Sequence, residues 1–199
     1  MSGVGVRGHF GQIAWVTAAL LIALPAAAQV PAPAAIQSLL AQGPNSPLGD
    51  DLTDFTSVRR FYVSRNNQPA WTGPGEQAQA QLAYDALAHS AQDGLDAARY
   101  HTDDIAALAK SRTADANVEY EILLSAELLR YENDVRLGQI APATVDRDVQ
   151  FPPQAFDSVA ETGAALAQGK FAEFLASLPP PHPEYANLKR ALASYRARP

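Results

Sequence analysis

Three carboxyl residues on one predicted helix are the strongest candidates for acid–base chemistry in this chain. They are Glu127, Glu132 and Asp134. Glu127 and Asp134 are seven residues apart, which is two helical turns, so they share a face with Tyr131 between them. A hydrolase of glycan strands needs a carboxyl pair or an isolated acid in a cleft. Acids on a long helix are more commonly solvated or paired with neighbouring arginines, and we favour that interpretation over a catalytic one.

The histidines and serines offer no stronger case for catalysis or metal binding. His101 precedes Asp103 and Asp104, but this cluster has a single imidazole, and a helix capped by Thr102 explains it more simply. The serines lack the Gly-x-Ser-x-Gly and Ser-x-x-Lys settings of activated nucleophiles. The glycines of residues 72–77 lack the lysine of a phosphate-binding loop. We therefore expect no metal site, no cofactor and no catalytic residue.

A cluster of arginines and aromatic residues could bind a ligand. It consists of Arg59, Arg60, Tyr62, Arg65 and Trp71. An aromatic plane beside guanidinium groups suits sugar faces and the carboxylates of peptides. Aromatic residues at helical spacing more commonly pack inside a protein, so the alternative is that Tyr62 and Trp71 belong to the core and the arginines form surface pairs.

The longest predicted element is a helix from about Ala114 to Leu137. Its apolar side chains occupy more than one face, which is typical of a helix at the centre of a domain. Gly138 is expected to end it, and Pro142 follows in the connection. No alternating run of β-branched residues competes with the helical patterns. The predicted fold class is all-α, a compact multi-helix domain packed around this one long helix.

Shorter helices are expected on both sides of the central one. The first starts at Thr53 or Asp54, and the next has a buried stripe of Leu82, Ala83, Ala86 and Leu87. The last should bury a stripe of Tyr185, Leu188, Leu192 and Tyr195. Apart from the first, the predicted ranges are 75–91, 102–111, 156–168, 171–177 and 183–196.

The N-terminal residues have the pattern of a secretory signal peptide. Arg7 precedes an apolar run over residues 13–24, and Ala26, Ala27 and Ala28 offer a small-residue cleavage site. About 12 apolar residues are too few to span a bilayer, which needs about 20. We predict a signal peptide at 1–28, cleaved near Ala28, a flexible Pro/Ala-rich lead-in at 29–52, and a helical domain at 53–199. A short helix from about Ala34 to Ala41 is an open alternative within the lead-in.

Charge and composition restrict the possible partners. The chain has 15 basic and 21 acidic residues, and the leader contains only Arg7 among them, so the remainder has 14 against 21, a net charge of −7. Binding to a phosphate backbone requires a basic face, so nucleic acid is not expected as a partner. After cleavage we expect no stable membrane span.

Four blocks in order along the chain resemble one known domain. They are VRRFYVSRNNQPAW (58–71), DGLDAARYH (93–101), LSAELLRYENDVRLGQIAP (124–142) and HPEYANLKRALASYR (182–196). Together they resemble the scaffold domain of the large murein L,D-transpeptidases, which cross-link peptidoglycan in the periplasm. The signature residues of the third block are Tyr131, Asp134, Gly138 and Pro142. The resemblance implies a structural role in the cell wall and periplasmic localisation.

The reaction of that family is not expected here. It uses a cysteine nucleophile in a Ser-His-Gly-Cys-x-Arg type motif, and this chain contains no cysteine. The favoured hypothesis is a non-catalytic periplasmic domain that associates with peptidoglycan or with a cell-wall cross-linking enzyme. The alternatives are a truncated or split transpeptidase whose catalytic domain is missing, and a cryptic peptidoglycan hydrolase. An exposed apolar face on the folded domain would predict a partner or self-association.

Overall fold

The computed structural model describes residues 32–49, 54–111, 113–140 and 155–198, and they form helices and turns without a β-strand. The prediction of an all-α domain is confirmed. The signal peptide, its cleavage site at Ala28 and the signature residue Pro142 lie outside the described residues. The α-helices are α1 Ala32–Gln42, α2 Phe55–Ser64, α3 Gln77–Ala88, α4 Thr102–Lys110, α5 Ala114–Leu137, α7 Ser158–Ala167, α8 Phe171–Ser177 and α9 Pro183–Arg196. Short 3-10 helices are η1 Gly43–Asn45, η2 Ser90–Asp93 and η3 Ala97–Tyr100.

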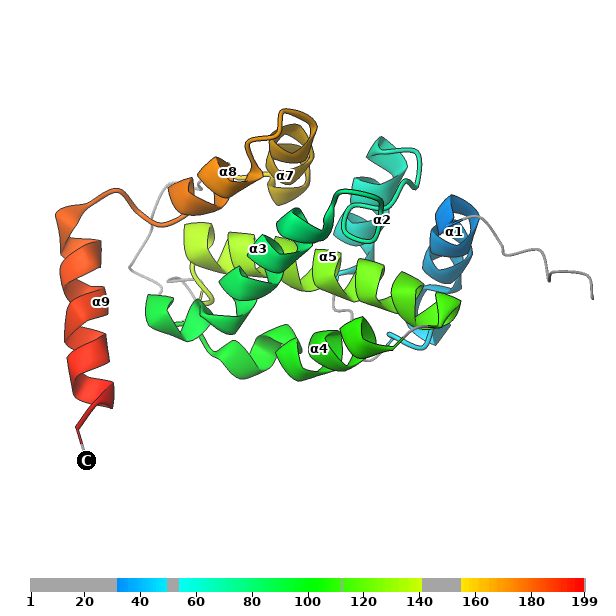
Figure 1. The fold of residues 1–199 in the computed structure, drawn as a ribbon. Helices are drawn as coiled ribbons and strands as arrows, with labels where there is room; N and C mark the ends of the chain where they lie inside the picture. The colour runs from blue at the N-terminus through cyan, green and yellow to red at the C-terminus, as the bar shows by residue number, and fades with distance from the viewer. Residues whose placement is uncertain (1–31, 50–53, 112, 141–154, 199) are drawn as a thin grey trace, which may run out of the picture.

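The helix α5 is the centre of the fold, as its sequence predicts. It packs against α1, α2, α3, α4 and α7, and Figure 1 shows it running through the middle of the molecule. Ile122, Leu123, Leu124 and Leu128 on this helix are fully buried. Because they point in several directions around the helix axis, α5 has core on more than one side.

Local signals fix both ends of α5. The Thr113 side chain accepts a hydrogen bond from the Ala116 N–H at 3.2 Å, which caps the first turn. At the other end the Gly138 N–H donates to the Asp134 carbonyl at 3.0 Å. Gly138 has φ +86° and ψ 149°, a conformation open to glycine and strained for other residues. The predicted bounds and the terminating role of Gly138 are confirmed.

Two details of the shorter helices correct the sequence prediction. In α3 the buried residues are Ala80, Ala83 and Leu87, whereas Leu82 is 39% exposed. In α4, Thr102 is the first helical residue and does not cap it. The preceding residue, His101, occupies the cap position with φ +44°. Asp103 and Asp104 lie in the first turn, as expected from the helix dipole.

The described part of the predicted lead-in belongs to the folded unit. The helix α1 is packed against α5 and buries Ile36, Leu39 and Leu40 in the common core. Arg59 of α2 donates to the Leu40 carbonyl at 2.9 Å, which ties the end of α1 to the next helix. The prediction of a flexible lead-in is therefore wrong for residues 32–49. The short helix that the sequence allowed at about Ala34 to Ala41 is present as α1, and its three buried apolar residues fix it in the core.

The last helix departs furthest from expectation. The bounds of α9, Pro183–Arg196, are those predicted, but none of its residues is buried. It stands at one end of the molecule and contacts η2 (Figure 1). The predicted core stripe is wrong, because Leu188 and Tyr195 are 68% and 64% exposed. No described helix is long and apolar enough to cross a membrane.

Candidate functional site

The two aromatic residues of the predicted binding cluster lie in the core. Tyr62 and Trp71 are fully buried. The Trp71 Nε1–H donates to the Ser125 Oγ at 2.8 Å, and the Tyr62 hydroxyl lies 2.7 Å from the same oxygen. Burial raises the pKa of Tyr62 well above its ordinary value. Both side chains are buried and hydrogen-bonded to Ser125 of α5, as the alternative interpretation of this cluster expects, so they are not open to a ligand.

A buried carboxylate organises this region, and the sequence analysis missed it. Glu121 of α5 is fully buried. Its oxygens accept from the backbone N–H groups of Ala70, Trp71 and Thr72, at 3.1 Å for Trp71 and 2.9 Å for Thr72. The Thr72 hydroxyl also donates, at 2.9 Å. Several donors on one carboxylate fix the loop after α2 against α5.

The sequence did contain a signal for Glu121. Glu121, Ser125, Leu128 and Glu132 recur at spacings of four, three and four along α5, so they share one helical face. All four are buried. Polar residues in the middle of an apolar helix face predict buried partners, because an unsatisfied carboxylate there would be costly. The two ends of this face are polar. Glu121 contacts the loop after α2, and Glu132 contacts α7.

The other end of this face is Glu132. Both of its carboxyl oxygens lie near the Thr162 hydroxyl of α7, at 2.7 and 2.6 Å. Burial raises the pKa of Glu132 to about 8, and the hydrogen bond from Thr162 opposes that rise only in part. The carboxyl group is therefore mostly protonated at neutral pH. It joins α5 to α7 and faces the protein interior.

The remaining candidate acids of α5 do not form an open catalytic pair. Glu127 is fully buried and lies 3.1 Å from the Arg130 Nη1. Asp134 accepts a hydrogen bond from the Tyr100 hydroxyl at 2.7 Å and another from Gln139 at 3.1 Å. Glu127 therefore does not face the substrate-sized space that a glycan hydrolase requires.

Asp134 does border a small pocket of about 160 Å³, together with Asp54. Asp54 accepts from the Ser57 N–H at 3.0 Å and so caps α2. Burial alone would raise the pKa of Asp54, but the hydrogen bonds from Ser57 outweigh it and the pKa is lowered. A general acid needs a raised pKa, so Asp54 is poorly suited to that task.

The signature residues form a contact between η3 and the end of α5. Tyr131 packs edge-on against Tyr100, with ring centroids 5.9 Å apart. Tyr100 donates in turn to Asp134, which lies one turn before the terminating Gly138. These three signature residues therefore hold a helix end in place. Their role among the described residues is structural.

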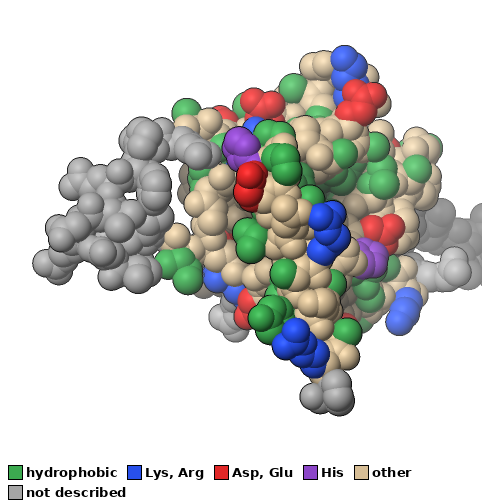
Figure 2. Space-filling view, turned by 90° about the vertical axis from the view of Figure 1, so that its left-hand side faces the viewer, with side chains coloured by type: hydrophobic (Ala, Val, Ile, Leu, Met, Phe, Trp, Pro, Cys, Tyr) green, Lys and Arg blue, Asp and Glu red, His purple; other side chains and the backbone are tan. Residues whose placement is uncertain are grey.

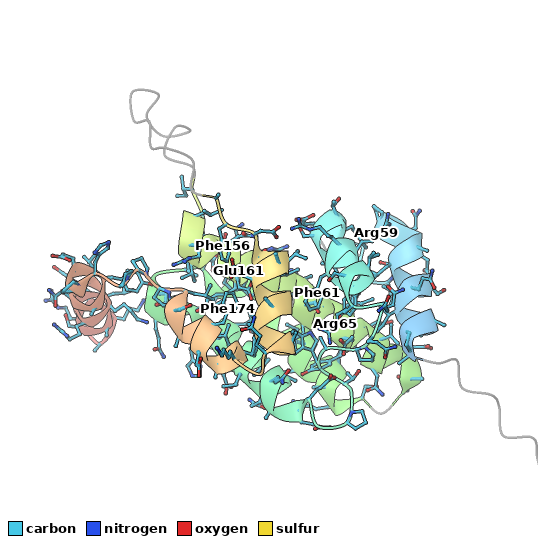
Figure 3. The ribbon with its side chains drawn as sticks, turned by 90° about the horizontal axis from the view of Figure 1, so that it is seen from above. Arg59, Phe61, Arg65, Phe156, Glu161 and Phe174 are labelled. Atoms are coloured by element: carbon cyan, nitrogen blue, oxygen red, sulfur yellow. The ribbon has the colours of Figure 1, made fainter. Side chains whose placement is uncertain are left out.

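A concave surface lies between α2 and α7. We call it the α2–α7 groove, and its volume is about 590 Å³. Phe61 and Val159 contribute apolar lining, and Arg60, Arg65 and Glu76 contribute charge. Figure 3 shows the labelled Phe61 of α2, and Arg65 directly after that helix, between α2 and α7. Two of the five predicted binding residues, Arg60 and Arg65, thus lie in one groove, whereas Arg59 points to α1.

Both arginines of the groove have partners. Arg60 forms a two-point pair with Asp157, at 2.5 Å for Nη2–Oδ1 and 3.0 Å for Nη1–Oδ2. Arg65 donates to the carbonyls of Gln68 and Pro69 at 2.9 and 2.8 Å. The Arg65 guanidinium also lies over the Phe61 ring, 5.2 Å from its centroid. Arg60 is thus held by one carboxylate, whereas Arg65 is held by two backbone carbonyls and the Phe61 ring.

Asp157 is the groove residue that sequence reasoning could not find. It caps α7 by accepting from the Ala160 N–H at 3.2 Å. That hydrogen bond, and after it the contact with Arg60, hold the pKa of Asp157 below its ordinary value. Arg60 and Asp157 are 97 positions apart in the sequence, and no local pattern links them.

Metal binding finds no support in the part of the chain that the structure describes. No group of three or more His, Cys, Asp or Glu side chains there could hold an ion. His101 lies 3.4 Å from Asp104, which is a local contact within one helical turn.

Comparison with known proteins identifies one relationship. A family model described as Scaffold domain matches residues 56–192. This range runs from the second residue of α2 through most of α9, and it includes both walls of the α2–α7 groove and all described signature residues. No curated protein and no solved structure matches the chain.

Proposed function

This chain belongs to the Scaffold domain family, and on that premise we propose that it is a non-catalytic periplasmic scaffold that associates with peptidoglycan. The matched range contains three of the four sequence blocks completely and most of the fourth. The resemblance to the scaffold domain of the murein L,D-transpeptidases is thereby confirmed.

The α2–α7 groove is the observation that carries the proposal. Stem peptides of peptidoglycan present carboxylates and free amino groups close together. The groove offers guanidinium groups from Arg60 and Arg65 and carboxylates from Asp157 and Glu76, beside the apolar surface of Phe61. Guanidinium groups bind carboxylates with two parallel hydrogen bonds. The groove therefore has complementary charges for both ends of such a peptide.

The Arg60–Asp157 pair is suited to exchange with a ligand. The two side chains are 55% and 46% exposed. Exposed ion pairs contribute about 0–1 kcal/mol, so opening this one costs little. A carboxylate of the ligand would take the place of Asp157 on Arg60, and an amino group of the ligand would then pair with Asp157.

Two features support a role without bond cleavage. The chain has no cysteine, so the family's thiolate nucleophile has no counterpart. The acids Glu121, Glu127 and Glu132 of α5 are buried. We therefore propose binding without turnover.

Export is proposed from the N-terminal sequence pattern alone. Fractionation of cells that express the full coding sequence should place the protein in the periplasm. N-terminal sequencing of that fraction should begin at Gln29, after the proposed cleavage at Ala28. A cytoplasmic protein with an intact N-terminus would contradict the localisation and leave the binding test below unaffected.

The binding test is co-sedimentation of the purified protein with isolated sacculi, followed by chromatography of the wall fragments. We expect retention without new fragments. Arg60→Gln should weaken retention about tenfold, because a hydrogen bond to a charged group contributes roughly 1.5–3 kcal/mol. Arg190→Gln removes an equal charge from α9, far from the groove, and should bind like the unchanged protein.

Three results would redirect the proposal. Equal losses of retention in Arg60→Gln and Arg190→Gln would indicate general charge attraction to the sacculi and no specific binding in the α2–α7 groove. No retention at all would favour a cell-wall cross-linking enzyme as the partner instead of the polymer. New fragments would contradict the non-catalytic role.

A further inference from the structure

One face of α9 makes polar contacts with the protein and includes the half-buried Leu192, and the other face carries exposed apolar side chains. Tyr185, Lys189 and Arg196 follow one another at spacings of four and seven, so they share a face. The Tyr185 hydroxyl donates to Asp93 of η2 at 2.8 Å, and the Lys189 ammonium lies 2.5 Å from the same carboxylate. Arg196 donates to the Ala91 carbonyl. Polar contacts with η2 thus hold α9 in place.

The opposite face carries a stripe of exposed residues. Its centre is Leu188, Ala191 and Tyr195, and its ends are Glu184 and Arg198, which follows the helix. All five are exposed. Figure 2 views this end of the molecule and shows hydrophobic side chains beside Lys and Arg side chains on its surface. Leucine and tyrosine side chains exposed together in this way mark interaction surfaces.

The stripe is complementary to itself when read in the opposite direction. Its members lie at spacings of four, three, four and three from Glu184 to Arg198. Turning a second copy end to end about Ala191 places Ala191 opposite Ala191 and Glu184 opposite Arg198, and it brings Leu188, three residues before the centre, beside Tyr195, four residues after it. Each apolar residue then meets an apolar residue, and each charge meets its opposite.

We propose that α9 mediates an antiparallel homodimer through this stripe. The exposed face is covered by a second copy of this chain, because the acidic end of the stripe in one copy lies beside the basic end in an antiparallel partner. A two-fold axis near Ala191 generates every contact twice, as closed dimers require. A parallel pair would place Glu184 against Glu184 and Arg198 against Arg198, which like charges disfavour.

The side chains suit this arrangement. Ala191 at the crossing point is small, and packed helices approach to about 8–10 Å when small residues meet. The Arg198 guanidinium lies over the Tyr195 ring, 4.4 Å from its centroid, so the cation is held at the end of the stripe. Two single helices bury less area than a stable interface, which predicts a dimer that dissociates on dilution.

Charge reversal tests the proposed pairing. Sedimentation velocity of the protein produced from its full coding sequence should show a concentration-dependent dimer. Glu184→Arg and Arg198→Glu should each raise the dissociation constant about tenfold, and the double variant should restore it. Glu173→Arg, an equal reversal on α8, should have no effect. A protein that stays monomeric at all concentrations, or a double variant that fails to recover, would overturn the antiparallel dimer.

A cross-linking experiment tests the same geometry without changing any charge. The chain has no cysteine, so Ala191→Cys introduces a single thiol beside the proposed two-fold axis. Mild oxidation or a short bismaleimide should yield a covalent dimer. Ala186→Cys places an exposed thiol on the other side of α9 and should remain monomeric. Equal cross-linking of both variants, or none with Ala191→Cys, would contradict the proposal. Circular dichroism of each variant confirms that the helix is intact.

Discussion

The helices α5 and α9 both carry apolar side chains at helical spacing, and the fold uses them in opposite ways. The central helix buries Leu124 and Leu128 and also buries the carboxyl groups of Glu121 and Glu132. The last helix exposes Leu188 and Tyr195. Neighbours determine this difference: α5 has helices on several sides, whereas α9 contacts the short η2.

The comparison shows that polarity alone does not decide what is buried. In α5, two acids are buried in the core because hydrogen-bond donors surround them. The backbone N–H groups of residues 70–72 donate to Glu121, and the Thr162 hydroxyl donates to Glu132. In α9, the Asp93 carboxylate on the neighbouring η2 attracts Tyr185 and Lys189. That attraction holds the face with Tyr185, Lys189 and the half-buried Leu192 against the protein and leaves Leu188 and Tyr195 exposed.

The largest expected effect on the free energy of unfolding comes from removing Glu121, a buried acid that accepts several hydrogen bonds. Glu121→Ala should lower the free energy of unfolding by roughly 4 kcal/mol or more, because several buried donors would lose their acceptor at about 1–3 kcal/mol each. Glu184→Ala on α9 should change it by less than about 0.5 kcal/mol, as is usual for exposed positions. Urea denaturation of dilute protein measures both. Similar losses in the two variants would contradict the contrast between the helices.

Helix bounds were the part of this fold that the sequence predicted best. The ends of α5 depend on local groups, the Thr113 side chain and Gly138, and these are visible in a single sequence. The bounds of α8 and α9 were also predicted correctly. Capping and backbone conformation act over a few residues, so no distant partner is needed to infer them.

The packing of those helices was predicted less well, because it depends on distant residues. The helix α1 is anchored by core residues and by Arg59, which is 19 positions from Leu40. The α9 stripe faces solvent because Asp93 holds the opposite face, more than 90 positions away in the sequence. For the candidate site, Arg60 and Arg65 were predicted, but the other wall of the groove, with Asp157, was not.

The buried acid Glu132 should also make the stability of the protein sensitive to pH. The pKa of Glu132 rises from 4.5 to about 8 on folding. Between these values the folded protein binds a proton that the unfolded chain has lost, so the contribution of Glu132 to stability is greatest at low pH and falls as pH rises. From pH 6 to pH 8 the loss should be roughly 2 kcal/mol, since one pKa unit corresponds to about 1.4 kcal/mol.

The variant Glu132→Gln isolates this contribution. Its amide cannot ionise, so its stability should depend less on pH over the same range, and above pH 8 it should exceed that of the unchanged protein. Glu184→Gln on α9 is the matched control and should keep the original pH dependence. Thermal unfolding at several pH values measures all three proteins. An unchanged slope in Glu132→Gln would show that Glu132 ionises normally in the fold.

The smallest expected effect compares the two helix ends. Gly138 has φ +86°, which a β-branched residue adopts only with strain, so Gly138→Val should cost about 1–3 kcal/mol. Ala197 ends α9 with φ −80° in an ordinary helical conformation, and Ala197→Val should change stability by less than about 0.5 kcal/mol. Urea denaturation again provides the measurement. If both valines cost the same, backbone strain at Gly138 is not what ends α5. If only Gly138→Val destabilises the protein, the end of the central helix depends on its glycine, whereas the end of α9 tolerates a larger side chain.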